Sequence, residues 1–226
     1  MKQTTKQAKL LGLIVIFTMI VLCLTNVVHA YFSAINQVSG EITFGGNSVR
    51  FAYTYSTAST GYVDDDTLVV YPVYSAGAEL KRGDSFGLQI VNGGTTTNIN
   101  KLSLNAQGGS SYVRLWINAY IVKNSVLDTS VNYGQYFEFT NIYASAFETK
   151  IVDVNNETRK MYYLKSPISS GVLTEICTGL TLLTTAPVEM LDKSFNITIN
   201  FDSVQVENQA FKAVFDDGWG YCSSWS

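Results

Sequence analysis

The chain has 226 residues, with 15 basic and 18 acidic side chains and a formal net charge of −3 at pH 7. Charged residues make up 15% and apolar residues 46%, which excludes a disordered chain, because such chains combine low hydrophobicity with high net charge. There is no basic excess to neutralise phosphates, so the composition argues against binding to nucleic acid. The 14 Tyr and 12 Phe residues favour strands and indicate a β-rich globular domain.

The first thirty residues have the pattern of a secretory signal peptide. Three lysines precede an apolar run over residues 10–24, and Val28-His29-Ala30 supplies the small-residue end of such a signal. We therefore expect a signal peptidase to cleave after Ala30 during export and to leave residues 31–226 as the mature protein. The alternative is an uncleaved anchor, because residues 10–30 are nearly long enough to span a bilayer. Contact with a membrane is expected only through this segment, before cleavage.

Cleavage would change the chemistry that the chain can perform. It removes three of the 15 basic residues and none of the 18 acidic ones, so the net charge falls from −3 to −6. It also removes His29, the one histidine of the sequence. A protein without histidine has no imidazole base, no Ser-His-Asp arrangement and no imidazole metal ligand. The sequence therefore predicts a protein that is not an enzyme and needs no cofactor or metal.

Two cysteines remain in the mature chain, Cys177 and Cys222. Export makes a disulfide between them chemically possible, and closing a loop of about 46 residues would stabilise the fold by about 4 kcal/mol. The alternative is two unrelated thiols, one buried and one in a loose tail, because Cys222 lies close to the C-terminus. The sequence leaves both possibilities open.

Alternation of apolar and polar residues with a period of two dominates the mature chain, as in strands with one buried and one wet face. It is clear over residues 49–55, 85–90, 113–121 and 195–202. Glycine-rich turns such as Gly45-Gly46-Asn47 and Asn92-Gly93-Gly94 separate these runs at short intervals. The pattern predicts an all-β fold, an antiparallel β-sandwich of jelly-roll type that forms a single domain over residues 31–226.

Three local features qualify this pattern. Residues 68–74 are strand-like, but Pro72 cannot donate a ladder hydrogen bond, so that strand is expected at a sheet edge. The alternation fails at 141–149 and 186–193, where one or two short helices are expected in connections. Asp64-Asp65-Asp66 could collect calcium, but a lone triplet lacks the further oxygens of a six- to eight-coordinate site, and a solvated loop is expected.

Four landmarks lie in a distinctive order along the chain: Ala30-Tyr31-Phe32-Ser33-Ala34, Leu80-Lys81-Arg82-Gly83-Asp84, Thr185-Ala186-Pro187-Val188-Glu189-Met190, and residues 195–208 followed by Trp219 and Trp225. In this order they resemble the TasA/camelysin family of exported proteins, whose signal is cleaved by a SipW-type peptidase. The match is partial. Arg82 stands where the family has proline, and Phe201-Asp202-Ser203 replaces its A-E-A.

The resemblance implies a jelly-roll-like sandwich, exported from a Gram-positive-type bacterium, that forms biofilm-matrix or cell-surface fibres with copies of itself. In fibre-forming members the mature N-terminal segment passes to the next subunit as a donor strand. Here that segment would run from Tyr31 to about Ile42, with an apolar stripe made of Tyr31, Phe32, Ile35 and Val38. The alternative is that the same stripe folds back as the first strand of its own domain.

Two other functions stay open at this point. Camelysin-like relatives are described as cell-surface metalloendopeptidases, but this chain lacks H-E-x-x-H and, once mature, any histidine. A monomeric polysaccharide-binding module would use Tyr112, Trp116 and Tyr120, which share one face of a predicted strand; these rings could equally form a second buried layer. The sequence favours a structural protein, secreted or on the cell surface, that binds copies of itself.

Overall fold

The structure is a computed structural model that describes residues 48–56, 59–73, 80–92, 94–140, 144–191 and 193–225. The predicted signal peptide, its cleavage site after Ala30 and the candidate assembly strand with Tyr31, Phe32, Ile35 and Val38 lie outside the described residues, so they stay predictions. Among the residues that the structure describes, no helix has the length and apolar character needed to cross a membrane.

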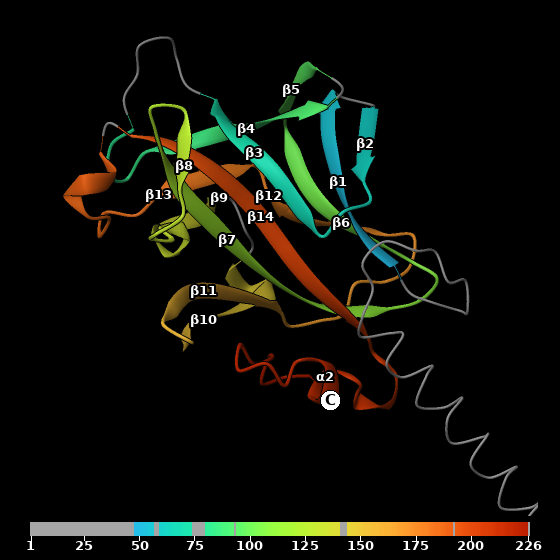
Figure 1. The fold of residues 1–226 in the computed structure, drawn as a ribbon. Helices are drawn as coiled ribbons and strands as arrows, with labels where there is room; N and C mark the ends of the chain where they lie inside the picture. The colour runs from blue at the N-terminus through green and yellow to red at the C-terminus, as the bar shows by residue number, and fades with distance from the viewer. Residues whose placement is uncertain are drawn as a thin grey trace, which may run out of the picture. The chain divides into compact units, whose positions relative to one another are not determined.

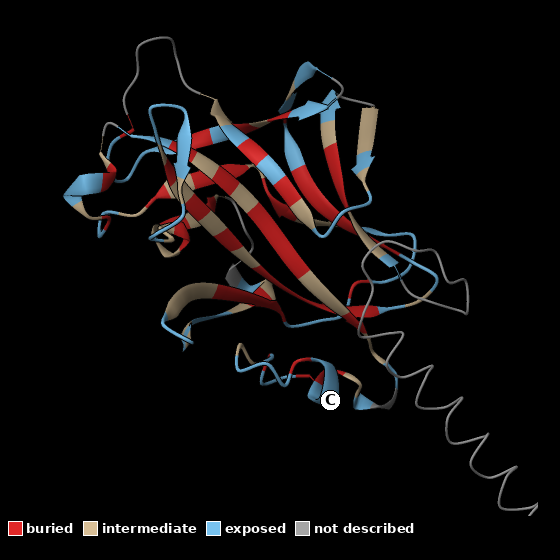
Figure 2. Ribbon diagram, viewed as in Figure 1, coloured by how far each residue is buried: buried red, intermediate tan, exposed pale blue. Residues whose placement is uncertain are grey.

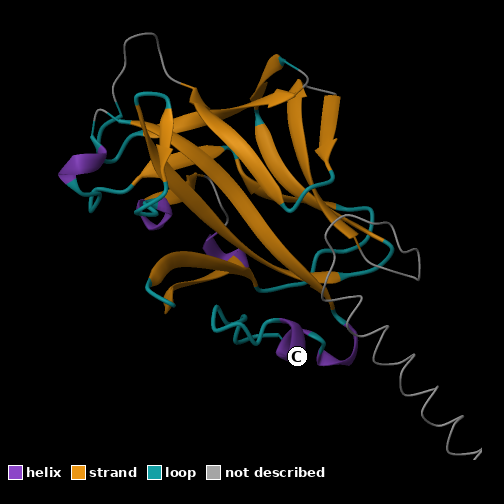
Figure 3. Cartoon of the chain, in the orientation of Figure 1, coloured by secondary structure: helices purple, strands orange, loops and turns teal. Residues whose placement is uncertain are grey.

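Strands make up most of the described chain, and the helical elements are single turns (Figure 3). The strands are β1 (Ser48–Ser56), β2 (Ser59–Val63), β3 (Thr67–Val73), β4 (Ser85–Asn92), β5 (Thr95–Ile99), β6 (Lys101–Gln107), β7 (Ser111–Lys123), β8 (Val126–Asp128), β9 (Phe137–Thr140), β10 (Phe147–Val154), β11 (Glu157–Leu164), β12 (Leu173–Cys177), β13 (Gly179–Leu182) and β14 (Ser194–Gln205). The helical turns are η1 (Gly134–Tyr136), η2 (Ala144–Ala146), η3 (Val188–Met190), η4 (Glu207–Gln209) and α2 (Phe211–Val214).

These strands form two antiparallel sheets (Figure 1). The small sheet has the order β12-β6-β1-β2, and the large sheet has the order β10-β11-β7-β14-β3-β4-β13-β9, with β5 added to β4 and β8 to β7. The chain crosses between the sheets repeatedly, because β6 and β12 belong to the small sheet while their chain neighbours belong to the large one. The predicted all-β antiparallel sandwich with short helices in its connections is confirmed.

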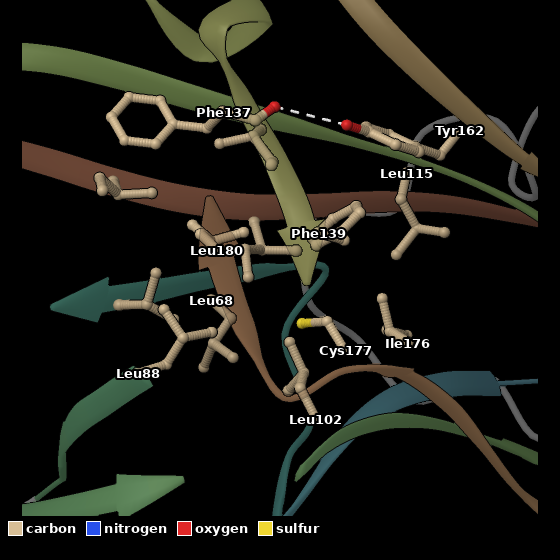
Figure 4. Packing of buried hydrophobic residues seen from close by; sticks show 14 of the residues in the cluster. Leu68, Leu88, Leu102, Leu115, Phe137, Phe139, Tyr162, Ile176, Cys177 and Leu180 are labelled. Atoms are coloured by element: carbon tan, nitrogen blue, oxygen red, sulfur yellow. Dashed lines mark hydrogen bonds between the residues drawn. The ribbon is translucent and has the colours of Figure 1, made fainter. Parts of the chain in front are cut away.

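The core lies between the inner faces of the two sheets. Leu102, Ile176 and Cys177 come from the small sheet and meet side chains of the large sheet, among them Leu88 and Leu180 (Figure 4). Figure 2 shows the buried residues alternating with exposed ones along β3, as period-two sequences require. Removal of these apolar side chains from water is the main stabilising contribution, at about 25 cal/mol per Å².

The longest pairing in the molecule joins β7 and β14, in register from Ser111 with Gln205 to Val122 with Ser194. Both strands alternate, so Ile117 and Ile199 face the core together while Asn118 and Thr198 face outward together. This pair forms the middle of the large sheet, and it confirms the two longest strands that the sequence predicts.

The expectation that the Pro72 strand is a sheet edge is wrong, because β3 lies between β14 and β4. The two pairings use different halves of β3: β14 pairs with Thr67–Val70, and β4 pairs with Tyr71–Val73. Pro72 therefore lies beyond the last residue that pairs with β14, where its missing N–H is not needed. The helical turn expected within 186–193 is present as η3, and in the described part of 141–149 the turn η2 precedes β10, which begins at Phe147.

The loop after β8 fills a gap beside β7. The gap exists because β11 pairs with β7 only at Met161–Tyr163. The side-chain oxygen of Asn132 accepts hydrogen bonds from the backbone N–H groups of Ala119 (3.0 Å) and Gly134 (2.9 Å). The N–H of Tyr133 donates to the carbonyl of Ala119 at 2.8 Å. The loop thus satisfies the polar backbone of β7 where no strand does so.

Candidate assembly surfaces

The two sheets end in four strands whose outer edges have no partner strand among the described residues. The small sheet ends in β2 and β12, and the large sheet ends in β10 and β9. An edge strand presents unpaired N–H and C=O groups and can pair with another chain, so natural proteins protect such edges with charges, prolines or bulges. The protection of each edge therefore indicates where another chain could add.

Three of the four edges carry charged residues. Glu175 of β12 pairs with Lys101 at 2.7 Å, Glu138 of β9 pairs with Lys160 at 2.7 Å, and β10 carries Glu148, Lys150 and Asp153. β2 has the sequence Ser-Thr-Gly-Tyr-Val and carries no charge and no proline. Of the four strands that end the sheets, it is the one without a charged residue; β5, which pairs only with β4 among the described strands, is likewise uncharged.

Aromatic side chains cover both faces of β2. On the inner face the ring of Tyr53 lies across Gly61, where a Cβ would be 2.2 Å from the Tyr53 ring. On the outer face the guanidinium of Arg50 lies 3.9 Å from the ring centre of Tyr62 and 3.2 Å from a carboxylate oxygen of Asp64. The strand is thus fixed from both faces while its outer edge keeps no partner strand in the described chain.

A second hydrophobic cluster lies on the outer side of the large sheet, where the C-terminal segment, residues 206–225, packs against β7, β11 and β14 (red end of the chain in Figure 1). The indole N–H of Trp225 donates to the carbonyl of Leu164 at 2.6 Å, and its ring stacks on that of Tyr112 with 4.8 Å between centroids. The buried members of the cluster are Tyr112, Met161, Tyr163, Val204, Phe211, Phe215, Cys222 and Trp225.

Arg114 joins the C-terminal segment to the sheet, and only 3% of its side chain is exposed. Its Nε and Nη2 donate to Asp202 on β14 at 2.8 and 2.7 Å, and its Nη1 donates to Asp217 at 2.9 Å and to the carbonyl of Gly220 at 3.0 Å. Its guanidinium also lies 4.2 Å from the ring centre of Phe215. One buried cation therefore holds two carboxylates and two parts of the C-terminal segment.

The electrostatics of this pair follow from burial and charge. Burial alone would lower the pKa of Arg114, but hydrogen bonds and charges from Asp217 and Asp202 raise it above its ordinary value. Burial alone would raise the pKa of Asp217, but the hydrogen bonds and charge of Arg114 hold it below its ordinary value. Both groups are therefore ionised in the folded protein, which suits a structural clamp.

Glu148 of β10 holds the end of the same segment. Its Oε2 accepts hydrogen bonds from the backbone N–H of Ser223 at 2.9 Å, from the Ser223 hydroxyl at 2.6 Å and from the Cys222 thiol at 3.2 Å. The neighbouring Lys150 pairs with its Oε1 at 2.6 Å. The hydrogen bonds from Lys150 and then Ser223 lower the pKa of Glu148 to about 2.

Acid should release the C-terminal segment. The stabilising charge of Glu148 is fully present above its ordinary pKa of 4.5 and is lost as pH falls toward about 2, and the lowered pKa of Asp217 acts in the same direction. Pepsin digestion across this pH range should cut within residues 206–225 before it cuts β7 or β14. The Glu148→Gln variant should show a flatter pH profile, and the exposed-site control Glu189→Gln should match the parent protein. A segment that stays protected at pH 2 would contradict this role.

The two cysteines are free, so the disulfide between Cys177 and Cys222 is not formed. Cys177 lies in the core between the sheets, where burial raises the pKa of its thiol to about 12, and Cys222 lies in the outer cluster. The sandwich therefore separates them by a whole sheet layer. The alternative of two unrelated thiols is correct. The expectation that Cys222 lies in a loose tail is wrong, because Cys222 is fully buried.

The three aromatic residues of a possible sugar platform are mostly covered. Tyr112 is buried beneath Trp225, and Trp116 packs against the outer cluster with the guanidinium of Arg159 5.0 Å from its ring centre. Tyr120 is half-buried further along the same face of β7. The alternative of a second buried layer therefore holds for Tyr112 and Trp116, and their rings are not an open stacking platform.

The acidic triplet forms local contacts within its loop. Asp64 pairs with Arg50, a side-chain oxygen of Asp65 accepts the backbone N–H of Thr67 at 3.2 Å, and Asp66 accepts the Thr67 hydroxyl at 3.3 Å. Within the described ranges, no group of three or more His, Cys, Asp or Glu side chains could hold a metal ion. The triplet lies in a turn between β2 and β3, as a solvated loop would.

Comparison with known proteins adds no relative to this picture. No protein-family model, curated protein or solved structure matches the chain. The surfaces that can contact another molecule are therefore assigned from the geometry alone, and the uncharged β2 edge is the first of them.

Proposed function

We propose that this protein is an exported structural subunit that assembles with copies of itself into a biofilm-matrix or cell-surface fibre through its mature N-terminal segment. The observation that carries the proposal is the edge strand β2, which lies beside β1 and has neither charge nor proline, whereas the three other strands that end the sheets have charged residues. A strand from another copy can add main-chain hydrogen bonds to such an edge.

The position of β1 supports this assignment. Residues 31–47 precede β1 in the sequence, and β1 is the direct neighbour of β2 in the small sheet. Successive side chains of a strand point to opposite faces, so in an added strand Tyr31 and Ile35 would lie on one face and Phe32 and Val38 on the other. The same stripe supplies the apolar burial that a backbone-only contact lacks.

The proposal predicts that a charge in the stripe prevents fibre growth. In the Ile35→Lys variant, adding the strand would bury an unpaired ammonium, which costs several kcal/mol, so the fibre mass should fall by at least about tenfold. The matched control is Asn36→Lys, which adds the same charge at the neighbouring polar position. The full chain should be expressed in a Gram-positive-type host, its mature N-terminus identified by mass spectrometry, and the extracellular fraction imaged by electron microscopy.

Two results would oppose the proposal. One is a processed protein that stays monomeric at high concentration, because a fibre subunit must associate. The other is an Ile35→Lys variant that forms fibres as the parent does, because the assembly strand would then lie elsewhere. A mature protein that retains residues 1–30 would remove the free N-terminus on which the mechanism depends.

A further inference from the structure

The outer face of the large sheet carries a set of ten residues without a charge at neutral pH. Register places Asn118 beside Thr198 and Thr198 beside Val69, and it places Tyr120 beside Asn196. The same face continues over β4 and β5, where Tyr71 pairs with Gln89, Gln89 with Asn98, and Val91 with Thr96. We call the set of Asn118, Thr198, Val69, Val91, Thr96, Tyr120, Asn196, Tyr71, Gln89 and Asn98 the uncharged face.

The uncharged face is broad and in contact with solvent. It spans β7, β14, β3, β4 and β5, and four strand spacings of about 4.8 Å separate β7 from β5 by about 19 Å. Three large apolar side chains on two adjacent strands are exposed: Val69 by 40%, Tyr71 by 38% and Val91 by 51%. Apolar residues grouped in this way on a solvent face mark an interaction surface rather than scattered exposure.

Charged residues border the uncharged face and also lie on other outer surfaces of the sandwich. Further along β7 and β14, Arg114 stands opposite Asp202, and on β11 Glu157, which pairs with Arg159, is linked to Asn118 through Asn132. The outer face of the small sheet carries Arg50, and Lys101 paired with Glu175. The Arg114 ion pairs join β7 and β14 to the C-terminal segment, and β10 carries the Glu148–Lys150 pair. The ten positions therefore form an uncharged patch with charged residues at its border.

We propose that the uncharged face packs against the same face of a second copy of this chain. In a two-fold contact each residue near the axis meets a residue of its own type, so a charged residue there would meet a like charge. Both the net charge of −3 and the expected −6 of the mature chain make identical copies repel one another. A face without charge is where two copies can approach.

The polar groups of this face are suited to pairing with themselves. Amide side chains of Asn and Gln, and the hydroxyls of Thr and Tyr, each both donate and accept hydrogen bonds, whereas Lys only donates and a carboxylate only accepts. A copy of the face can thus satisfy the polar groups that it covers, while Val69, Tyr71 and Val91 supply apolar contact. Depletion of charge with retention of Tyr is typical of the centre of protein interfaces.

This inference goes beyond the proposed fibre, because the face-to-face contact does not use the N-terminal segment. The test therefore uses the Ile35→Lys background, in which end-to-end assembly is blocked. Protein from the medium or the cells, after expression of the full chain, should form a dimer in sedimentation velocity experiments over a range of concentrations. Adding Val69→Lys should weaken the dimer at least about 100-fold, because two lysines would meet near the axis.

The matched control is Ile151→Lys, which places the same charge at a 67% exposed apolar position on β10, away from the face, and should leave the dimer unchanged. Thr198→Lys, at a polar position of the face, should weaken the dimer as Val69→Lys does. This result would show that the added charge, and not the loss of apolar packing, weakens the dimer. Unaltered urea midpoints show that the variants fold. A monomeric Ile35→Lys protein, or a Val69→Lys dimer as tight as the control, overturns the proposal. If the parent protein is monomeric and binds a neutral polysaccharide column, and the Val69→Lys variant does not bind it, the face would be assigned to glycan binding instead.

Discussion

Replacing Arg114 with methionine should lower the free energy of unfolding by about 3 kcal/mol. The substitution keeps the length of the side chain but leaves the carboxylates of Asp202 and Asp217 without their cation. Breaking a buried ion pair by removing one partner costs about 3–5 kcal/mol, and the lower end applies because both carboxylates are partly exposed and can be hydrated. Urea unfolding followed by tryptophan fluorescence measures this loss.

Arg50→Met is the matched control, because Arg50 also stands on an outer sheet face and pairs with a carboxylate. Asp64 is largely exposed, so the loss of that pair should cost less than about 1 kcal/mol. A double-mutant cycle between Arg114→Met and Asp217→Asn should also give a coupling free energy well above that of Arg50 with Asp64. Equal costs for the two arginine variants would show that the Arg114 cluster does not hold the C-terminal segment.

The importance of Arg114 illustrates what the sequence cannot show. Period-two alternation places Arg114 on the outer face of its strand, and it does the same for Asp202 on another strand. The two meet only because β14 pairs with β7 in a register that brings Asp202 opposite Arg114. Pairing across 88 positions depends on the whole fold, so local patterns predicted the strands but not this ion pair.

The same reasoning explains the other differences. Pro72 argued for an edge because a proline cannot donate, but β3 changes partner midway and leaves that position unpaired on one side. The cysteines allowed a disulfide, and only the layer structure shows that a sheet separates Cys177 from Cys222. The alternation did not single out Ser59–Val63 as a strand, and the place of β2 at a sheet edge required the topology.

A single methyl group at Gly134 should destabilise the fold by about 3 kcal/mol. A Cβ at this position would lie 1.8 Å from the carbonyl oxygen of Ile117 and 2.6 Å from its carbonyl carbon. These are backbone atoms of β7 and cannot move as a flexible side chain can, so the loop must lift away from the strand. The hydrogen bonds that join Asn132 and Tyr133 to Ala119 would then lengthen. The loss of stability would therefore have two contributions, overpacking against β7 and backbone groups left without hydrogen bonds.

Gly87→Ala separates this steric effect from the general effect of replacing glycine. A Cβ at Gly87 meets only the Cβ of Val73, at an ordinary contact distance of 3.8 Å, so the stability should change by less than about 1 kcal/mol. Hydrogen exchange should locate the damage in Gly134→Ala at the N–H groups of Ala119 and Tyr133, with β4 unaffected. If both alanine variants unfold at the same urea concentration, the loop does not need its close approach to β7, and the gap beside that strand must be filled in another way.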